Sequence, residues 1–281
     1  MEGSATKGRL EGDRPTIGAL TRGARKTLRN VSAYVLPPGA ALLAAGVAWE
    51  LWVRIGDVAE YIVPAPTAIA ADLFGDIGWF VIHGAVTLVE AAAGFALGAT
   101  VAIIGAVIMS RSRATERSLL PLAVLVKVTP IVAVAPLFVI WFGFGSFPKI
   151  LVASLITFFP VLVNALAGLR SVSYEALDLF RSLNASNTEI LWKLRAPCSL
   201  PYLFAAFRIS VPLSVIGAVV GEWFTGDRGL GSVIIVAHNN LDMPRLFAAV
   251  AVLAVIGISL TALTWYAEKR VLFWHESERV F

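Results

Sequence analysis

The chain has 281 residues, of which 58% are hydrophobic and only 15% are charged. Its mean hydropathy of +0.78 is typical of a polytopic membrane protein rather than of a soluble domain. The net charge of +4 raises the question of nucleic-acid binding, which the placement of the charges, given below, argues against. A single cysteine, Cys198, excludes a disulfide framework and a thiolate metal cage.

Residues 1–30 are predicted to form a basic cytoplasmic tail without regular structure. No small-residue cleavage site follows a short apolar core here, so we expect the first apolar run to be retained. Two interpretations of the tail stay open: a charged leader, or a segment that binds anionic lipid. The remainder, residues 31–281, is predicted to be one transmembrane domain.

Six apolar runs are long enough to cross a membrane, because a spanning helix needs roughly 20 mostly apolar residues. They predict an all-α polytopic membrane protein with about six transmembrane helices. The second run follows Trp79–His83, which we interpret as an interfacial lead-in with a bend at Gly84. Pro130 and Pro136 are expected to kink the third run. The runs cover residues 34–53, 84–108, 119–142, 150–169, 202–224 and 246–267.

The basic residues orient these helices, because Lys and Arg collect in cytoplasmic loops. Most of the 23 Lys and Arg residues fall on one side of a six-span topology, within residues 7–29, 111–117, 170–195 and 269–279. Both termini are therefore predicted to be cytoplasmic. The residues left for the opposite side are Arg54, Lys149, Arg228 and Arg245, and those within spans are Lys127 and Arg208.

The connector between the fourth and fifth runs is predicted to form two short amphipathic helices. Ser173 can cap the first helix, and Asn184 follows it at a position that favours a left-handed residue. Ser186 and Glu189 form a capping box that begins the second helix. Pro197 is expected to end the regular pattern near the membrane. The alternative is a helix pair that simply lies on the bilayer surface.

This connector resembles the EAA loop of binding-protein-dependent ABC importer permeases, with the pattern E-A-A, three residues, G, nine residues, I-x-L-P. Over about residues 173–197, the E-A-A falls on Asp178-Leu179-Phe180, the Gly on Asn184 and the I-x-L-P on Leu194-Arg195-Ala196-Pro197. The spacing matches throughout. Asp replaces Glu and Asn replaces Gly, while Leu179 and Phe180 are bulkier than the alanines that they replace.

Other stretches resemble the aliphatic sulfonate, nitrate and taurine branch of that family. VPAPTAI resembles its L-P-S-P-x-x-V entry, and GFALGATVAIIGAVI (Gly94–Ile108) resembles its small-residue-rich span. KVTPIVAVAPLFVIWFGFG (Lys127–Gly145) resembles R-x-I-P-x-x-A-x-x-P-L-x-I-x-W-F-G-x-G, and GEWFTGDRGLG (Gly221–Gly231) resembles A-E followed by G-L-G. The resemblance covers about residues 34–275.

The resemblance implies a type I ABC importer permease fold in a bacterial inner or plasma membrane. Its implied partners are a second permease subunit, expected to be an identical copy, a cytoplasmic ABC ATPase dimer and an extracytoplasmic solute-binding protein. Because the chain has no G-x-x-x-x-G-K-[ST] loop, we expect it to bind no cofactor and not to be an enzyme, while the partner ATPase uses ATP and Mg. The implied solute is small and anionic (sulfonate, nitrate or taurine), with vitamin precursors as another class.

In this resemblance, the first helix and the turn after it would dock on the ATPase and move as a rigid lever. The residues expected to couple in this way are Asp178, Leu179, Phe180, Arg181, Asn184, Ala185, Ser186 and Pro197.

Candidate pathway residues are Lys127, Pro130, Asn164, Arg208 and Glu222. At about 1.5 Å per residue, Lys127, Asn164 and Arg208 fall in one layer of the cytoplasmic half, where no acidic residue is predicted. Two unpaired cations at that depth indicate a weakly anion-attracting vestibule, unless both side chains snorkel to the interface. Glu222 is predicted near the outer end of its span, as a structural partner or a pathway residue. The histidines are too scattered for a metal site.

Two other classes of protein stay open. A proton-coupled secondary transporter would show a longer chain with internal repeats and acidic relays at mid-membrane. An intramembrane enzyme would show a Ser/His or paired-carboxylate constellation at matching depth. Co-purification of an ATPase would separate the permease from both.

Overall fold

The computed structural model describes residue 37 and residues 39–273, which divide into two compact units, Met1–Val58 and Ala59–Phe281. The predicted tail lies outside the described residues, as does the beginning of the first predicted span. In the first unit, residues 39–55 form a helix, and the Gly56 N–H donates to the Trp52 carbonyl oxygen at its end.

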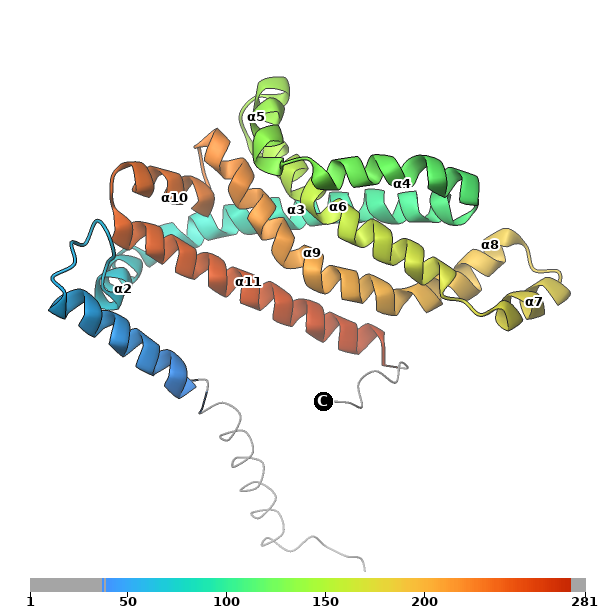
Figure 1. The fold of residues 1–281 in the computed structure, drawn as a ribbon, viewed down its shortest axis with the longest axis horizontal. Helices are drawn as coiled ribbons and strands as arrows, with labels where there is room; N and C mark the ends of the chain where they lie inside the picture. Colours follow the sequence, from blue (N-terminus) through green and yellow to red (C-terminus); the bar gives the residue numbers. More distant parts are fainter. Residues whose placement is uncertain (1–36, 38, 274–281) are drawn as a thin grey trace, which may run out of the picture. The chain divides into compact units, whose positions relative to one another are not determined.

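The second unit consists of helices and their connections over its described residues, which confirms the all-α prediction (Figure 1). Its elements are α2 (Pro66–Gly75), α3 (Ile77–Ser110), α4 (Arg113–Val128), α5 (Ile131–Phe142), α6 (Ser146–Arg170), α7 (Tyr174–Ser182), α8 (Asn187–Ile190), the π-helical turn η1 (Leu191–Arg195), α9 (Ala196–Thr225), α10 (Leu230–Asn239) and α11 (Met243–Val271).

Four helices within the described residues are long and apolar enough to cross a membrane, and the pair α4 and α5 adds a fifth if it is one broken span. The four are α3, α6, α11 and the helix Asn187–Thr225, in which α8, η1 and α9 are continuous. They contain the second, fourth, fifth and sixth predicted runs. The third run falls on α4 and α5.

The helix bounds add detail to two of the predicted spans. Helix α3 is continuous from Ile77, so Trp79–His83 and Gly84 belong to the same helix as the second predicted run. A Cβ on Gly84 would make ordinary van der Waals contact with Ile256 of α11 at 3.4 Å. The third run is broken rather than kinked, because α4 and α5 meet at 95° where Pro130 precedes α5.

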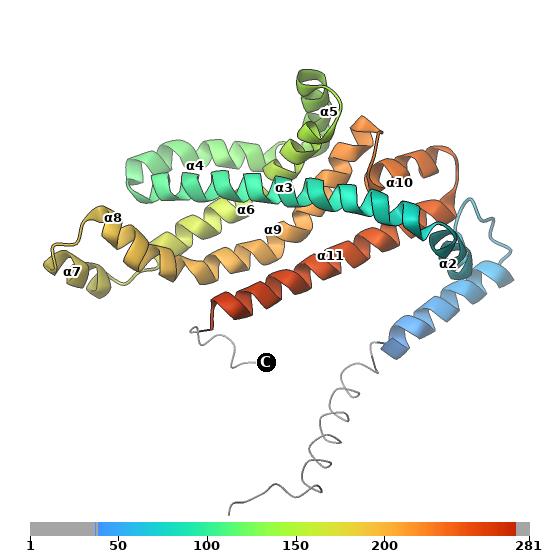
Figure 2. The same ribbon diagram turned by 180° about the vertical axis from the view of Figure 1, so that it is seen from behind.

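Helix α6 lies between α3 and α9 and packs closely against both (Figures 1 and 2). A Cβ on Gly94 would overlap Ala153 of α6, and one on Gly98 would overlap Thr157. On the other side, a Cβ on Gly217 of α9 would lie 2.5 Å from the Ala153 Cα. The small residues of α3 and α9 therefore allow close helix packing against α6.

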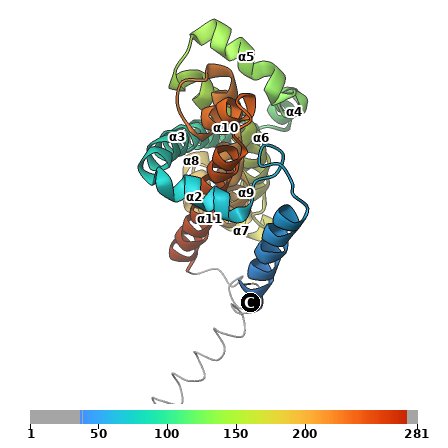
Figure 3. The same ribbon diagram turned by 90° about the vertical axis from the view of Figure 1, so that its left-hand side faces the viewer.

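The two ends of the long helices carry different short helices. Helices α7 and α8 lie at one end of the long spans, and α10 lies at the other (Figures 1 and 2). Helices α5 and α11 lie on opposite sides of the α3–α6–α9 core (Figures 1 and 3). The core therefore connects the predicted coupling end with the α10 end.

Candidate functional site

Helices α7 and α8 are capped at their N-termini by side chains. The Ser173 hydroxyl accepts a hydrogen bond from the Ala176 N–H at 3.3 Å. The Ser186 hydroxyl accepts from the Glu189 N–H at 3.3 Å, and the Glu189 carboxylate accepts from the Ser186 N–H at 3.0 Å. Between the helices, Asn184 has a φ of 53°. The predicted N-cap, left-handed turn residue and capping box are confirmed.

The capping box is stable against acid. The Ser186 backbone N–H lowers the pKa of the Glu189 carboxyl from its ordinary value of 4.5 to about 2, and the Lys193 ammonium, 3.0 Å away, adds to the shift. Because this pKa is lowered in the folded state, the stabilisation is present above pH 4.5 and is lost as the pH falls toward 2. The second helix therefore keeps its cap throughout the neutral range.

The predicted coupling residues lie at the surface of this end of the unit. Helix α7 has no buried residue, and Leu179 and Leu183 have 58% and 71% of their surface exposed. A capped helix with exposed apolar side chains is a candidate contact surface. Of the predicted set, Phe180 and Ala185 are half-buried, and those that are exposed are Asp178, Leu179, Arg181, Asn184, Ser186 and Pro197.

The prediction that Pro197 ends the second helix is wrong. The helix continues through it to Thr225, and the irregularity lies one turn earlier, in the π-helical turn η1. There the Ala196 N–H donates to the carbonyl oxygen of Leu191, five residues back. Pro197 directly follows this turn, as the second residue of α9.

Lys127 lies beside a cavity at the broken span. The cavity has a volume of about 350 Å³, and its lining residues include Thr129 and Ile131 on either side of Pro130. The Lys127 ammonium lies 4.8 Å from the centroid of the Phe159 ring, a cation–π contact. No ion pair of Lys127 is found within residues 39–273.

The structure contradicts the prediction that Arg208 is an unpaired cation at the depth of Lys127. Its guanidinium lies 2.5 Å from the Glu268 carboxylate of α11. Leu213 lines the Lys127 cavity and lies five positions after Arg208, or about 140° around α9. Glu268 could not be recognised as the partner from the sequence, because it falls just outside the sixth predicted run. Arg208 and Lys127 therefore do not share an anion-attracting vestibule.

Asn164 makes its hydrogen bond within its own helix. Its side-chain amide donates to the Pro160 carbonyl oxygen, four residues earlier in α6, at 2.8 Å. Asn164 is not among the residues that line the cavity beside Lys127, whereas Pro160 is. Of the three residues predicted to form a polar layer, only Lys127 therefore lies at this cavity without a polar partner within the described residues.

A buried ionic cluster lies at the α10 end of the core. Lys149 of α6 is fully buried, and its ammonium lies 3.1 Å from the Glu90 carboxylate of α3 and 2.7 Å from Asp227. It also donates to the Arg228 carbonyl oxygen at 3.2 Å, and the Ser146 hydroxyl donates to Glu90 at 2.8 Å. The cluster joins α3, α6 and the α9–α10 loop.

Glu222 supports the backbone of the same loop. Its carboxylate accepts from the Thr87 hydroxyl at 2.7 Å and from the Gly231 N–H at 2.5 Å. Gly229 has a φ of +106°, and a Cβ on it would overlap the Glu222 carboxylate. The loop therefore needs glycine at Gly229 for two reasons, its positive φ and the close approach of a buried carboxylate. The Gly229 N–H donates to the His83 ring nitrogen at 3.1 Å.

The sequence analysis placed Lys149 in an outer connector and so missed its role. The residue falls one position before the fourth predicted run, and helix α6 begins at Ser146, which brings the side chain inside. Gly221 makes this burial sterically feasible, because a Cβ there would lie 2.8 Å from the Lys149 Cα. The sequence signal for a buried lysine is a single basic residue at the edge of an apolar run. The contacts with Glu90 and Asp227 are seen only in the structure. Within residues 39–273, no three His, Cys, Asp or Glu residues gather to hold a metal.

Replacing Lys149 with Met should destabilise the protein by about 3–5 kcal/mol, because it leaves the buried Glu90 carboxylate without its cation. The free energy of unfolding of the purified chain in detergent micelles measures the loss. Adding Glu90→Gln should recover part of it, with a coupling energy of about 0.5–3 kcal/mol between the two sites.

Arg228→Met is the matched control, since Arg228 is exposed at the same end of the unit. It should change the stability by less than about 0.5 kcal/mol. Strictly additive effects of Lys149→Met and Glu90→Gln would contradict a stabilising ion pair.

Comparison with known proteins agrees with this architecture. Residues 94–273 match the family model of the binding-protein-dependent transport system inner membrane component. A probable ABC transporter permease protein of Haemophilus influenzae is 37% identical over 78% of this chain and 91% of its own length. The formylaminopyrimidine transport permease protein ThiX of Halalkalibacterium halodurans is 34% identical over 88% of this chain and 99% of its own length.

The fold has a counterpart among solved structures. A chain of the MetNI methionine ABC transporter in an inward-facing conformation matches with a TM-score of 0.56 and 16% identity, over 69% of this chain and 96% of that one. The matched family consists of non-catalytic transmembrane components, so the enzyme alternative is set aside. The chain belongs to the binding-protein-dependent transport system inner membrane components and is the permease subunit of an ABC importer.

Proposed function

We propose that two copies of this chain form the pathway for a small anionic solute, with a sulfonate as the first candidate. We also propose that α7 and the turn after it dock on a cytoplasmic ATPase dimer and move with it. Membership of the family implies an ATPase and a binding protein as partners. We further propose that both termini are cytoplasmic and that the second permease subunit is an identical copy. ATP and Mg would be used by the ATPase alone.

The observation that carries the coupling proposal is the mechanical continuity behind the exposed turn. The helix from Asn187 to Thr225 is unbroken, so it can transmit a displacement of the turn to the far end of the core. Both short helices are capped, and Asn184 fixes the angle between them. A rigid, exposed pair of this kind suits a lever that rocks the spans.

The solute pathway is proposed to pass the break between α4 and α5. The cavity there has the Lys127 ammonium at its edge, and its walls are otherwise largely apolar. A cation without a carboxylate partner attracts an anion while the apolar walls limit competing water. We assign solute contact to Lys127 and the backbone around Pro130, because Asn164, Arg208 and Glu222 have their polar groups bound within the chain.

A pyrimidine precursor of a vitamin is the second candidate solute. The relative named for formylaminopyrimidine transport is aligned over 99% of its length, which favours this class. A neutral solute of this kind would not depend on the charge of Lys127. Identification of the ligand that co-purifies with the cognate binding protein would decide between the two classes.

A photo-crosslinking amino acid in place of Ala185 should capture the cognate ATPase in the assembled transporter. The yield should change when ATP binds, because the docked turn moves with the ATPase dimer. The same amino acid at Arg228, an exposed position at the α10 end, is the control and should capture no ATPase. Failure of Ala185 and its neighbours in the turn to capture the ATPase would overturn the docking proposal.

Asn184→Gly should retain solute uptake, whereas Asn184→Val should lose most of it. A β-branched residue resists the φ of 53° by roughly 1–2 kcal/mol, so valine would change the angle between α7 and α8. Uptake and ATPase co-purification are measured together on the same membranes. Equal uptake by both variants would show that the backbone geometry at this position is unimportant.

Lys127→Gln should slow uptake of an anionic solute about tenfold, the effect expected from losing one charge-assisted contact. Lys127→Arg should largely retain uptake because it keeps the charge. Arg117→Gln, an exposed position on the same helix, is the control and should leave uptake unchanged. Normal uptake by Lys127→Gln would exclude Lys127 from the pathway.

A further inference from the structure

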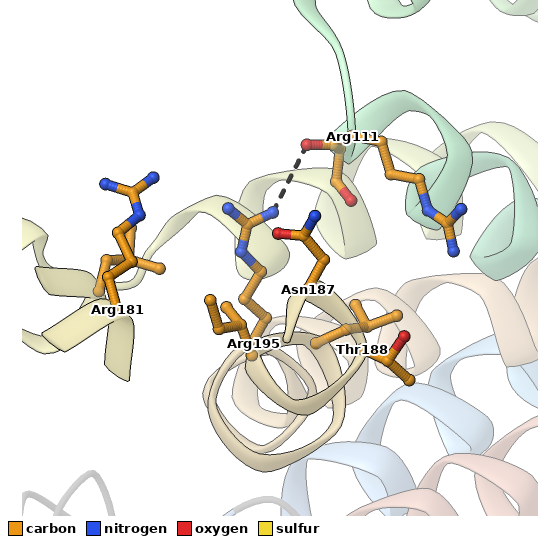
Figure 4. A pocket seen from close by; sticks show the side chains of 9 residues that line it. Arg111, Arg181, Asn187, Thr188 and Arg195 are labelled. Atoms are coloured by element: carbon orange, nitrogen blue, oxygen red, sulfur yellow. Dashed lines mark hydrogen bonds between the residues drawn. The ribbon is translucent and has the colours of Figure 1, made fainter. Parts of the chain in front are cut away.

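The coupling end of the core holds arginine-lined cavities that share only Arg181 with the predicted coupling residues and no residue with the proposed solute pathway. One cavity, of about 350 Å³, lies among the end of α3, helices α7 and α8, and η1 (Figure 4). Its basic lining residues are Arg111, Arg181 and Arg195. A second cavity, of about 330 Å³, shares Arg111 and Arg195 with the first and adds Arg113 and Arg170.

Among the residues that the structure describes, no acidic residue lines either cavity. Two of the arginines have carboxylate partners elsewhere: Arg170 binds Glu116 at 2.6 Å, and Arg181 forms an exposed pair with Asp178 at 3.2 Å. Within residues 39–273, neither Arg111 nor Arg195 forms an ion pair. The two cavities therefore carry an uncompensated positive charge.

Arg195 is only partly satisfied by the protein. One of its terminal nitrogens donates to the Ser110 carbonyl oxygen at 3.5 Å, a long contact (Figure 4). Its Nε is buried and has no hydrogen-bond partner among the described residues. A buried guanidinium nitrogen without an acceptor is costly, and an anion in the cavity would supply one.

The depth of the cavities points to a lipid. Helix α3 is 34 residues long, about 51 Å at 1.5 Å per residue, and the hydrocarbon core is about 30 Å thick. A helix that exceeds the core by about 20 Å extends beyond it, which would bring the last residue of α3, Ser110, to the level of the lipid headgroups. The first cavity also has apolar walls from Leu177, Ile190 and Leu191, which suit the glycerol and upper acyl region of a lipid.

We infer that these cavities bind the phosphodiester headgroup of an anionic phospholipid, with Arg111 and Arg195 as its principal ligands. Guanidinium groups pair with phosphate oxygens through two parallel hydrogen bonds, and basic pockets between spans select anionic headgroups. The lipid would bridge the end of α3 and the π-helical turn that leads into α9. This role is separate from ATPase contact and from solute binding.

Native mass spectrometry of the purified chain can test this with phosphatidylglycerol and phosphatidylcholine of the same acyl chains. Phosphatidylglycerol should be retained preferentially. Arg111→Gln should weaken its retention about fivefold, and Arg111→Gln with Arg195→Gln about 25-fold, while phosphatidylcholine is unaffected. Arg111→Lys should keep part of the retention, because it preserves the charge but not the bidentate geometry.

Arg228→Gln is the matched control: it removes an exposed arginine at the opposite end of the unit and should leave retention unchanged. Equal losses for Arg228→Gln and Arg111→Gln would overturn the inference in favour of non-specific charge attraction. Displacement of the lipid by millimolar inorganic phosphate would assign the site to a soluble phosphate instead. If Arg111→Gln weakens ATPase association but leaves lipid retention unchanged, the cavities would be assigned to a contact with the ATPase instead. If Arg195→Gln fails to fold, Arg111→Gln decides alone.

Discussion

The close approach of α6 to α3 and α9 is the constraint on which the rest of the second unit depends. Lipid tails are as apolar as the spans, so helices in a membrane associate by packing and by internal polar contacts. Gly98 and Gly217 bring the backbones close enough for both. The same closeness at Gly221 lets the Lys149 side chain run between α6 and α9 to reach Glu90 and Asp227.

Helix α9 links the two polar ends that this packing creates. At one end, Glu222 holds the glycine-rich loop that leads into α10. At the other end, the π-helical turn η1 connects α9 to the capped helix α8. Single π-helical turns inside α-helices are often found at functional sites. Here the turn lies within one continuous helix, between the long span and the short segment next to the turn at Asn184.

Local features of the coupling end could be predicted from the sequence because they depend on residues a few positions apart. Ser173, Asn184 and the Ser186–Glu189 pair each determine the backbone within one helical turn. Most of the spans could be predicted in the same way, because each depends on one continuous apolar stretch of the sequence. The continuation of the helix through Pro197 could not be predicted, because it depends on a shift to π geometry that has no strong sequence signal.

Partners distant in the sequence were the other source of error. Arg208 and Glu268 are 60 positions apart, and Lys149 and Asp227 are 78 apart. Depth counting along single spans cannot show that α9 faces α11 at Arg208, or that α6 begins early enough to bury Lys149. The predicted layer of Lys127, Asn164 and Arg208 was wrong for this reason, because the prediction took Arg208 to be unpaired although it contacts Glu268.

Contact with a carboxylate distinguishes the cations that stabilise the fold from those that are free to bind an anion. Lys149 and Arg208 each contact a carboxylate on another segment, so their charges are balanced when the chain is folded. Lys127 and Arg111 each line a cavity and face no carboxylate within the described residues. An unbalanced charge in or beside a membrane is tolerated only where water or an anion meets it. Lys127 and Arg111 are therefore the cations at the two anion sites proposed above: the broken span for a solute, and the end of α3 for a lipid headgroup.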